Sequence, residues 1–180
     1  HETVADLAEA DVILVNTCGF IESAKTEAIE NILEACSYKQ QNPELKVIVT
    51  GCLAERYRSQ IEEEIPEVDA VVGCASNKAI DTIVARLFHG EDHLESYGAK
   101  KDFPLGGKRV IGTPAHYAYL KIAEGCNNRC HYCAIPGIRG PLHSRDMADC
   151  VAEARWLAGE GVKELIVVAQ DPTAYGEDWG

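Results

Sequence analysis

The first 90 residues alternate three short apolar runs with segments of helical periodicity, and this order constrains the fold more than any other feature of the sequence. The runs Val12–Val15, Val47–Val49 and Ala70–Val72 are continuous, as in strands that are buried on both faces. After the first run, apolar residues recur on one helical stripe between Ile21 and Cys36. Buried strands that alternate with helices predict an α/β fold with a doubly wound parallel sheet.

Two more helices are expected in this part of the chain, from about Leu53 to Ile65 and from about Lys78 to Phe88. Residues 91–114 are rich in glycine and charge and follow neither the helical nor the strand period. They predict a linker, with at most one short extended piece at residues 109–111. The first domain is therefore predicted over residues 1–90.

Residues 115–180 contain one further β-α-β unit. A strand from Tyr117 to Ile122 precedes a cysteine-rich loop, a helix from about Asp146 to Ala158 and a buried strand from Glu164 to Ala169. The apolar stripe of that helix is predicted to consist of Met147, Val151, Ala154 and Leu157. Two strands and one helix cannot close a core of their own, so residues 115–180 are expected to be the beginning of a second domain.

The charge and hydropathy of the chain exclude several classes of protein. The 180 residues carry 17 Lys and Arg against 29 Asp and Glu, a formal net charge of −12, which disfavours a surface that binds DNA directly. No apolar run approaches the about 18–20 residues that a membrane span needs. No export signal is visible, although the chain opens on His1. These features predict a cytoplasmic protein without a membrane segment.

The eight cysteines are too few for a disulfide scaffold and too unevenly spaced for one. In a chain without an export signal, they favour metal binding or redox chemistry. Cys18, Cys52 and Cys74 each follow a predicted strand. The carboxyl ends of parallel strands meet at one edge of a sheet, so Cys18 and Cys52 are expected to face one site.

The strongest chemical signal is the spacing of Cys126, Cys130 and Cys133, three cysteines within eight residues. Three thiolates on one short loop can bind three irons of a 4Fe-4S cluster, which is ordinarily held by four cysteines. No fourth cysteine lies nearby, so one iron would keep an open coordination position. Such a position is where a substrate or cofactor binds a metal.

The Cys-x₃-Cys-x₂-Cys spacing, with Tyr132 before the last cysteine, resembles the signature of the radical S-adenosylmethionine (SAM) superfamily. Further phrases resemble its methylthiotransferases, and among them the branch that modifies an aspartate of a small-subunit ribosomal protein. They are NTCGFI at Asn16–Ile21, VTGC at Val49–Cys52, CAIPGIRG at Cys133–Gly140 and QDPTAYG at Gln170–Gly176. The resemblance implies that residues 115–180 begin a partial (β/α) barrel and that residues 1–90 are the family's N-terminal domain without its start.

The resemblance also implies the cofactors and their ligands. Cys126, Cys130 and Cys133 match the ligands of the radical SAM 4Fe-4S cluster, and Tyr132 matches the aromatic beside the adenine of SAM. Cys18 and Cys52 match two of the three ligands of an auxiliary 4Fe-4S cluster. The family's first auxiliary cysteine has no counterpart here, so this cluster is expected to be incomplete in the chain.

The implied reaction adds a methylthio group to the β-carbon of the aspartate and consumes two molecules of SAM. One SAM supplies the methyl group, and the other yields the 5′-deoxyadenosyl radical that removes hydrogen from the β-carbon. The implied partners are the ribosomal protein and an electron donor of flavodoxin or ferredoxin type. Because the chain also lacks the remaining barrel strands and the small C-terminal domain of the family, we expect it to be a fragment without complete turnover.

Alternatives remain open from the sequence. The substrate could be isopentenyladenosine in tRNA, as in the sister branch of the family. The second domain could be a non-catalytic module that binds zinc through the three cysteines and either His131 or His143. Cys74 could replace the missing auxiliary ligand, although packing is favoured for Cys74 as it is for Cys36 and Cys150. Four polar residues near the loop have no assigned role: Arg139, Arg145, Gln170 and Asp171.

Overall fold

The computed structural model describes residues 2–100, 103, 105–107 and 109–180, which form two compact units, residues 1–102 and 103–180. Two predicted segments include residues outside this set. They are the first domain, which includes residue 1, and the expected linker, which includes residues 101–102, 104 and 108. The two units are described separately below.

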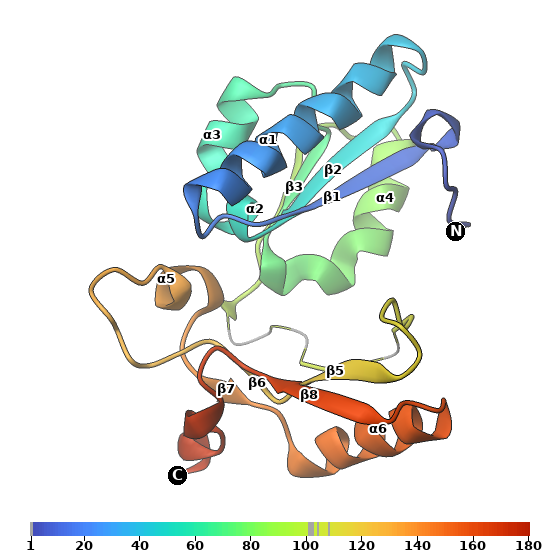
Figure 1. Cartoon of the computed structure of the whole chain (residues 1–180). Coiled ribbons are helices and arrows are strands. Elements are labelled where there is room, and N and C mark those ends of the chain that lie inside the picture. The colour runs from blue at the N-terminus through green and yellow to red at the C-terminus, as the bar shows by residue number, and fades with distance from the viewer. Residues whose placement is uncertain (1, 101–102, 104, 108) are drawn as a thin grey trace. The chain divides into compact units, whose positions relative to one another are not determined.

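The first unit is built on a parallel four-stranded sheet in the order β1-β2-β3-β4 (Figure 1). The strands are β1 Val12–Thr17, β2 Lys46–Gly51, β3 Ala70–Val72 and β4 Leu94–Ser96. The predicted strands lie where the apolar runs are. The strand β4 lies within the segment expected to lack secondary structure, and that expectation was wrong for residues 94–96. Only Leu94 of its three residues is buried, so it gave no apolar run.

Helices cover both faces of this sheet, which confirms the predicted α/β class. They are α1 Glu22–Ser37, α2 Cys52–Arg56, α3 Arg58–Glu64 and α4 Ile80–Phe88. Alternate residues of β2 belong to different cores. Val47 and Val49 pack with α1, α2 and α3, whereas Ile48 packs with α4. Successive side chains of a strand point to opposite faces, so α4 lies on the face opposite the other three helices.

Two of the predicted helices differ from the structure. The helix expected over residues 53–65 is divided at Tyr57, whose backbone is not helical (φ −121°, ψ 32°). The ring of Tyr57 lies against the cationic groups of Lys25 and Arg56, 5.3 and 5.1 Å from its centroid. The helix expected from Lys78 begins as a 3₁₀ turn at Cys74 and becomes α-helical only at Ile80. Further 3₁₀ turns in the described part of the chain span Leu7–Glu9, Tyr38–Gln40, Pro172–Ala174 and Glu177–Trp179.

The second unit contains the β-α-β arrangement that the sequence predicted (Figure 1). Strands β5 Tyr117–Lys121 and β8 Glu164–Val168 pair in parallel. The chain between them includes the cysteine-rich loop and then helix α6 Met147–Gly159. A short antiparallel pair, β6 Ala123–Glu124 with β7 His143–Ser144, and the five-residue helix α5 Ile135–Arg139 were not predicted. They bracket the cysteine-rich loop.

Helix α6 is rotated relative to the predicted apolar stripe. Met147 and Val151 are exposed, whereas Cys150 and Leu157 are buried, and Leu157 packs with Ala118 of β5. The prediction was wrong for the first two residues because Glu153 is turned inward. Its carboxylate forms ion pairs with two arginines, and these contacts fix which side of the helix faces the sheet.

Candidate functional site

Three of the cysteines of the second unit, Cys126, Cys130 and Cys133, lie on the irregular segment between β6 and α5. Cys130 is exposed, Cys126 and Cys133 are partly exposed, and none forms a disulfide. The backbone N–H of Asn128 donates to Sγ of Cys126 at 3.5 Å, and the N–H of Cys133 donates to the carbonyl of Cys130 at 2.9 Å. Cysteine thiolates are the usual ligands of iron–sulfur clusters, and these three thiols are at least partly accessible.

The two ends of this loop are joined at its base. The N–H of Cys126 donates to the carbonyl of Gly140 at 3.2 Å, and the N–H of Leu142 donates to Oδ1 of Asn127 at 3.1 Å. Gly125 has a φ of +74°, and a Cβ at this position would collide with the carbonyl oxygen of Pro141. The position therefore requires glycine. The cysteines thus lie on a closed loop rather than on an open connection.

The residues after β8 contact the same loop, which gives Gln170 and Asp171 the roles that the sequence left open. Nδ2 of Asn128 donates to Asp171 at 2.7 Å, and Nε2 of Gln170 donates to Oε1 of Glu124 at 2.7 Å. Hydrogen bonds from Thr173 and Asn128 lower the pKa of Asp171, because they stabilise its carboxylate. These contacts connect the end of β8 to the start of the cysteine loop.

The two arginines that follow the loop pair with different carboxylates. Arg139, at the end of α5, donates from Nη1 to Oε2 of Glu124 at 3.3 Å. Arg145 is 6% exposed and forms an ion pair with Glu153 on α6. Both arginines therefore have partners within the protein. The sequence analysis assigned no role to either carboxylate, Glu124 or Glu153.

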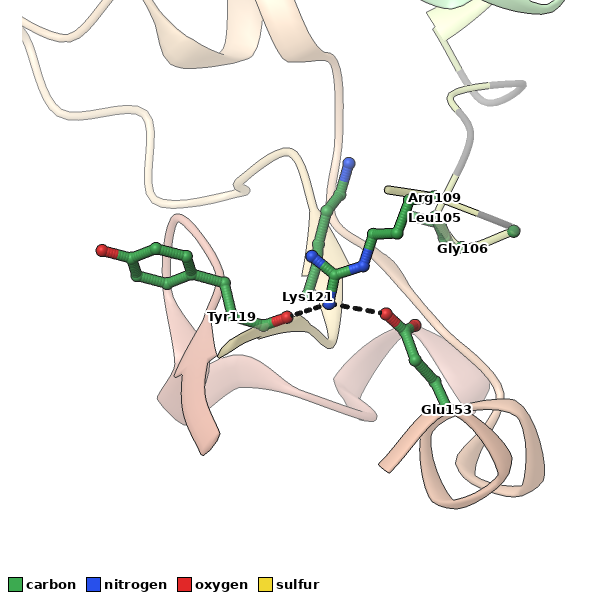
Figure 2. Close-up of a pocket in the computed structure, with 7 residues that line it drawn as sticks. Leu105, Gly106, Arg109, Tyr119, Lys121 and Glu153 are labelled. Carbon is green, nitrogen blue, oxygen red and sulfur yellow. Dashed lines mark hydrogen bonds and ion pairs between the residues drawn. The ribbon is translucent and has the colours of Figure 1, made fainter. Parts of the chain in front are cut away.

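A cavity of about 250 Å³ lies beside the outer edge of β5 and is lined by Arg109, Tyr119, Lys121 and Glu153 among others. Figure 2 shows the guanidinium of Arg109 between the backbone carbonyl of Tyr119 and the carboxylate of Glu153, which lies at 2.9 Å. Lys121 points away from this pair (Figure 2). The cavity contains none of the predicted site residues, and two of its charged groups, Arg109 and Glu153, pair with each other, so we assign it a structural role.

Tyr132 and the histidines near the loop concern two ideas that the sequence raised, the stacking of Tyr132 on SAM and a zinc site. The side chain of Tyr132 is exposed, as a stacking partner for a ligand must be. His143 lies 3.8 Å from Asp178. Across the residues that the structure describes, no three His, Cys, Asp or Glu side chains are grouped to hold a single metal ion. Within the described residues, this holds for the three loop cysteines by themselves and for their combination with His131 or His143.

In the first unit, Cys18, Cys52 and Cys74 occupy equivalent positions after three neighbouring strands. Thr17 is paired with Gly51 and Thr50 with Val72, so the three cysteines follow strand ends that lie side by side. A Cβ on Gly19 would lie 3.0 Å from the backbone of Leu53, which places the turn after β1 against the start of α2. The structure thus brings the segments of Cys18 and Cys52 together at one sheet edge.

The three cysteines of this edge differ in accessibility. Cys18 is exposed, whereas Cys52 and Cys74 are each 3% exposed. The N–H of Cys74 donates to Oε2 of Glu55 at 3.1 Å, which fixes the backbone at the start of its 3₁₀ turn. Two thiols on adjacent strand ends fit part of a cluster ligand set.

Two family models match the chain, in the order that the fold suggests. The model described as uncharacterized protein family UPF0004 matches residues 1–73, and the radical SAM superfamily matches residues 120–179. The second match includes the whole cysteine loop, α5, α6 and β8. Among the described residues, no helix is long and apolar enough to cross a membrane.

Curated relatives match the chain along nearly its whole length. All three that follow are named ribosomal protein uS12 methylthiotransferase RimO. The protein of Acetivibrio thermocellus is 51% identical over 98% of this chain and 40% of its own length. Those of Caldicellulosiruptor saccharolyticus and Clostridioides difficile are 46% and 47% identical, over 98% and 99% of this chain and 40% of theirs. The chain therefore spans about two fifths of the length of these relatives. It belongs to the radical SAM methylthiotransferase family, and the relatives that it resembles over nearly its whole length are of the RimO type.

Proposed function

We propose that the chain is part of a radical SAM methylthiotransferase that adds a methylthio group to the β-carbon of an aspartate in ribosomal protein uS12. The observation that carries this proposal is the closed loop with three accessible cysteines, in a chain whose relatives are named for that reaction. The β-carbon hydrogen of an aspartate is too weakly acidic for a side-chain base to remove. The difficult step therefore belongs to a cofactor.

In this proposal Cys126, Cys130 and Cys133 hold a 4Fe-4S cluster, and SAM binds the iron that has no cysteine ligand. When bound, the cluster supplies the electron that cleaves SAM. The N–H of Asn128, which donates to Sγ of Cys126, stabilises negative charge on that sulfur. Tyr132 is exposed on the same loop and stacks on the adenine of SAM.

The proposal assigns the thiols of the first unit to an auxiliary 4Fe-4S cluster that takes part in supplying the methylthio group. Cys18 and Cys52 are its ligands here, since they follow two strands that pair with each other and end at the same edge of the sheet. The exposure of Cys18 leaves one side of this site open to a sulfur-containing reactant. The remaining ligand positions are not assigned to residues of this chain.

The proposed partners follow from charge and chemistry. The net charge of −12 favours a basic protein substrate over a polyanion, because like charges repel an acidic surface from RNA. The reducing electron comes from a carrier of flavodoxin or ferredoxin type. The proposed location is the cytoplasm, because the ribosomal substrate and the reducing conditions that suit both clusters are found there.

The experiment that tests the reaction class is the reductive cleavage of SAM. The chain is reconstituted anaerobically with iron and sulfide, reduced with dithionite and incubated with SAM, and 5′-deoxyadenosine is measured. We expect formation of this product by the native chain and none by the Cys126→Ala, Cys130→Ala, Cys133→Ala triple variant. A native chain that holds four irons at this loop yet yields no more product than the triple variant would contradict the proposal.

The choice of substrate is tested by binding. Fluorescence anisotropy is measured for labelled uS12 and for a labelled tRNA anticodon stem-loop that carries isopentenyladenosine, over a range of salt concentrations. We expect saturable binding of uS12 that weakens as salt is added. Tighter binding of the tRNA stem-loop would instead assign the chain to the tRNA-modifying branch.

A further inference from the structure

Glu124 is a carboxylate in the interior of the second unit. Its residue is 1% exposed, and it lies in β6, two positions before the first cysteine of the loop. An unpaired carboxylate in such a place would be strongly destabilising. Its partners therefore decide whether this residue is tolerated and what it does.

Three side chains from three separate elements converge on this carboxylate. Nε2 of Gln170, which follows β8, donates to Oε1 at 2.7 Å. Nη1 of Arg139, at the end of α5, donates to Oε2 at 3.3 Å, and Nζ of Lys121 in β5 forms an ion pair with the same oxygen. Both carboxylate oxygens are thus occupied, and two positive charges face one negative charge.

These contacts span the cysteine loop. Glu124 precedes Cys126 and Arg139 follows Cys133, so their ion pair joins the two ends of the segment that holds all three cysteines. The neighbouring backbone bond from Cys126 to Gly140 closes the same base. Gln170 connects the segment after β8 to the same base. The next residue, Asp171, accepts a hydrogen bond from Asn128 within the loop.

We infer that Glu124 is a positioning residue for the cluster: its buried carboxylate closes the base of the cysteine loop and fixes the three thiols relative to β8. This inference rests on the proposed function, since it assigns a task toward the cluster that the loop is proposed to hold. Residues outside the ligand set that orient metal ligands commonly change metal affinity 10- to 100-fold when they are replaced. Glu124 has the contacts expected of such a residue.

The test compares two substitutions that remove the same charge from similar surroundings. Glu124→Gln keeps the size of the side chain but removes the negative charge that pairs with Lys121 and Arg139. Glu153→Gln is the matched control. Glu153 is also largely buried, and its two ion-pair partners, Arg109 and Arg145, lie outside the cysteine loop. Gln170→Ala is a milder third variant that removes a single hydrogen bond.

The measurements are the rate at which a chelator removes iron from the reconstituted protein, the response of the EPR signal to SAM, and the thermal midpoint. We expect Glu124→Gln to lose iron about tenfold faster or more than the native chain, with a broadened or absent response to SAM. Gln170→Ala should change in the same direction by a smaller factor. Glu153→Gln should lower the thermal midpoint but retain iron at the native rate.

The outcomes separate this inference from the proposed function. If the native chain binds iron and responds to SAM while Glu124→Gln and Gln170→Ala release iron at the native rate, the positioning role of Glu124 is refuted and the proposed function stands. Equal acceleration in Glu153→Gln and Glu124→Gln would also refute it, because the effect would then follow general destabilisation. A native chain that takes up no cluster at the loop would refute the proposed function itself.

Discussion

At the scale of single residues, the surroundings of Cys36 suit a cysteine that packs in the core rather than one that binds iron. Burial raises the pKa of Cys36 from 9.0 to about 11, and the carboxylates of Glu67 and Asp69 add to this shift while Lys39 opposes it. Cys18 and Cys130 are exposed. Since the thiolate is the form that binds metal and reacts, Cys36 is not suited to either role.

The first prediction concerns the reactivity of Cys36. At pH 8 a pKa near 11 leaves about 100-fold less thiolate than an ordinary cysteine has, so iodoacetamide should modify Cys36 at least about 100-fold more slowly than Cys130. Peptide mass spectrometry of the metal-free chain over time measures both rates, and the urea-unfolded chain is the control in which they should converge. Equal rates in the folded chain would contradict the assignment.

The same raised pKa has a consequence for stability. The folded chain holds the thiol proton more tightly than the unfolded chain, so the stabilisation is complete below pH 9 and is lost as the pH rises toward 11. We expect the free energy of unfolding to fall over this interval and Cys36→Ser to show a smaller fall. Urea titrations at several pH values provide the measurement, and a native profile identical to that of the variant would be inconsistent with this account.

Cys74 is predicted to be a packing residue despite its place beside Cys52. Both Cys74 and Cys36 are buried, so Cys36→Ala is a suitable control for Cys74→Ala. We expect both variants to bind as much iron after reconstitution as the native chain does, as measured by a colorimetric iron assay. If only Cys74→Ala lost iron, the result would instead indicate that Cys74 is a ligand of the auxiliary cluster.

At the scale of elements, the outer edge of β5 is protected by side chains in place of a neighbouring strand. The carbonyls of residues 117, 119 and 121 point to this edge and accept hydrogen bonds from Thr113, Arg109 and Arg145, respectively. Unpaired strand edges invite pairing with other chains, and charged side chains prevent it. Residues 109–113 of the expected linker thus contribute to the second unit.

The prediction at this scale is that Arg109→Ala destabilises the second unit. The variant removes a donor from the carbonyl of Tyr119 and one of the two cations of Glu153, a loss of about 1–2 kcal/mol. The control is Arg155→Ala, which replaces an exposed arginine of α6. Urea unfolding followed by the fluorescence of Trp156 and Trp179, which both belong to the second unit, should show a lower midpoint for the first variant only. Equal midpoints would show that the arginine contributes nothing at this edge.

The elements also show what the sequence could and could not predict. Strands β1, β2 and β3 and helix α1 follow from apolar runs and one helical stripe, which are local patterns. The pair of Glu124 with Gln170 joins residues 46 positions apart, and that with Arg139 joins residues 15 apart. Whether a carboxylate is buried depends on such distant partners, so neither Glu124 nor the rotation of α6 about Glu153 could be predicted.

At the scale of the whole molecule, the resemblance carried by the cysteine motif and the four sequence phrases predicted the family, and the family models and relatives confirm it. The positions of the cysteine segments could be anticipated because strand ends meet at one edge of a parallel sheet. The ligand roles of the cysteines, and the role of Tyr132, stay predictions. The contacts that close the loop were found only in the folded chain.

The chain is predicted not to complete the reaction alone. It spans about two fifths of the length of its relatives, and in the part of the second unit that is described the main sheet has two strands, with Val167 of β8 51% exposed. A site that must exclude water needs more cover than this. Mass spectrometry of uS12 incubated with the reconstituted chain, SAM and a reductant should show no methylthiolated aspartate, and detection of that product would contradict the prediction.

The most direct test of the central claim is the EPR spectrum of the anaerobically reconstituted, reduced chain, recorded with and without SAM and paired with an iron determination. The account predicts at least about four irons per chain and a signal that changes when SAM is added, both attributable to Cys126, Cys130 and Cys133 by their loss in the triple alanine variant. Iron that remains in the triple variant with an unchanged signal, or a native signal indifferent to SAM, would contradict it.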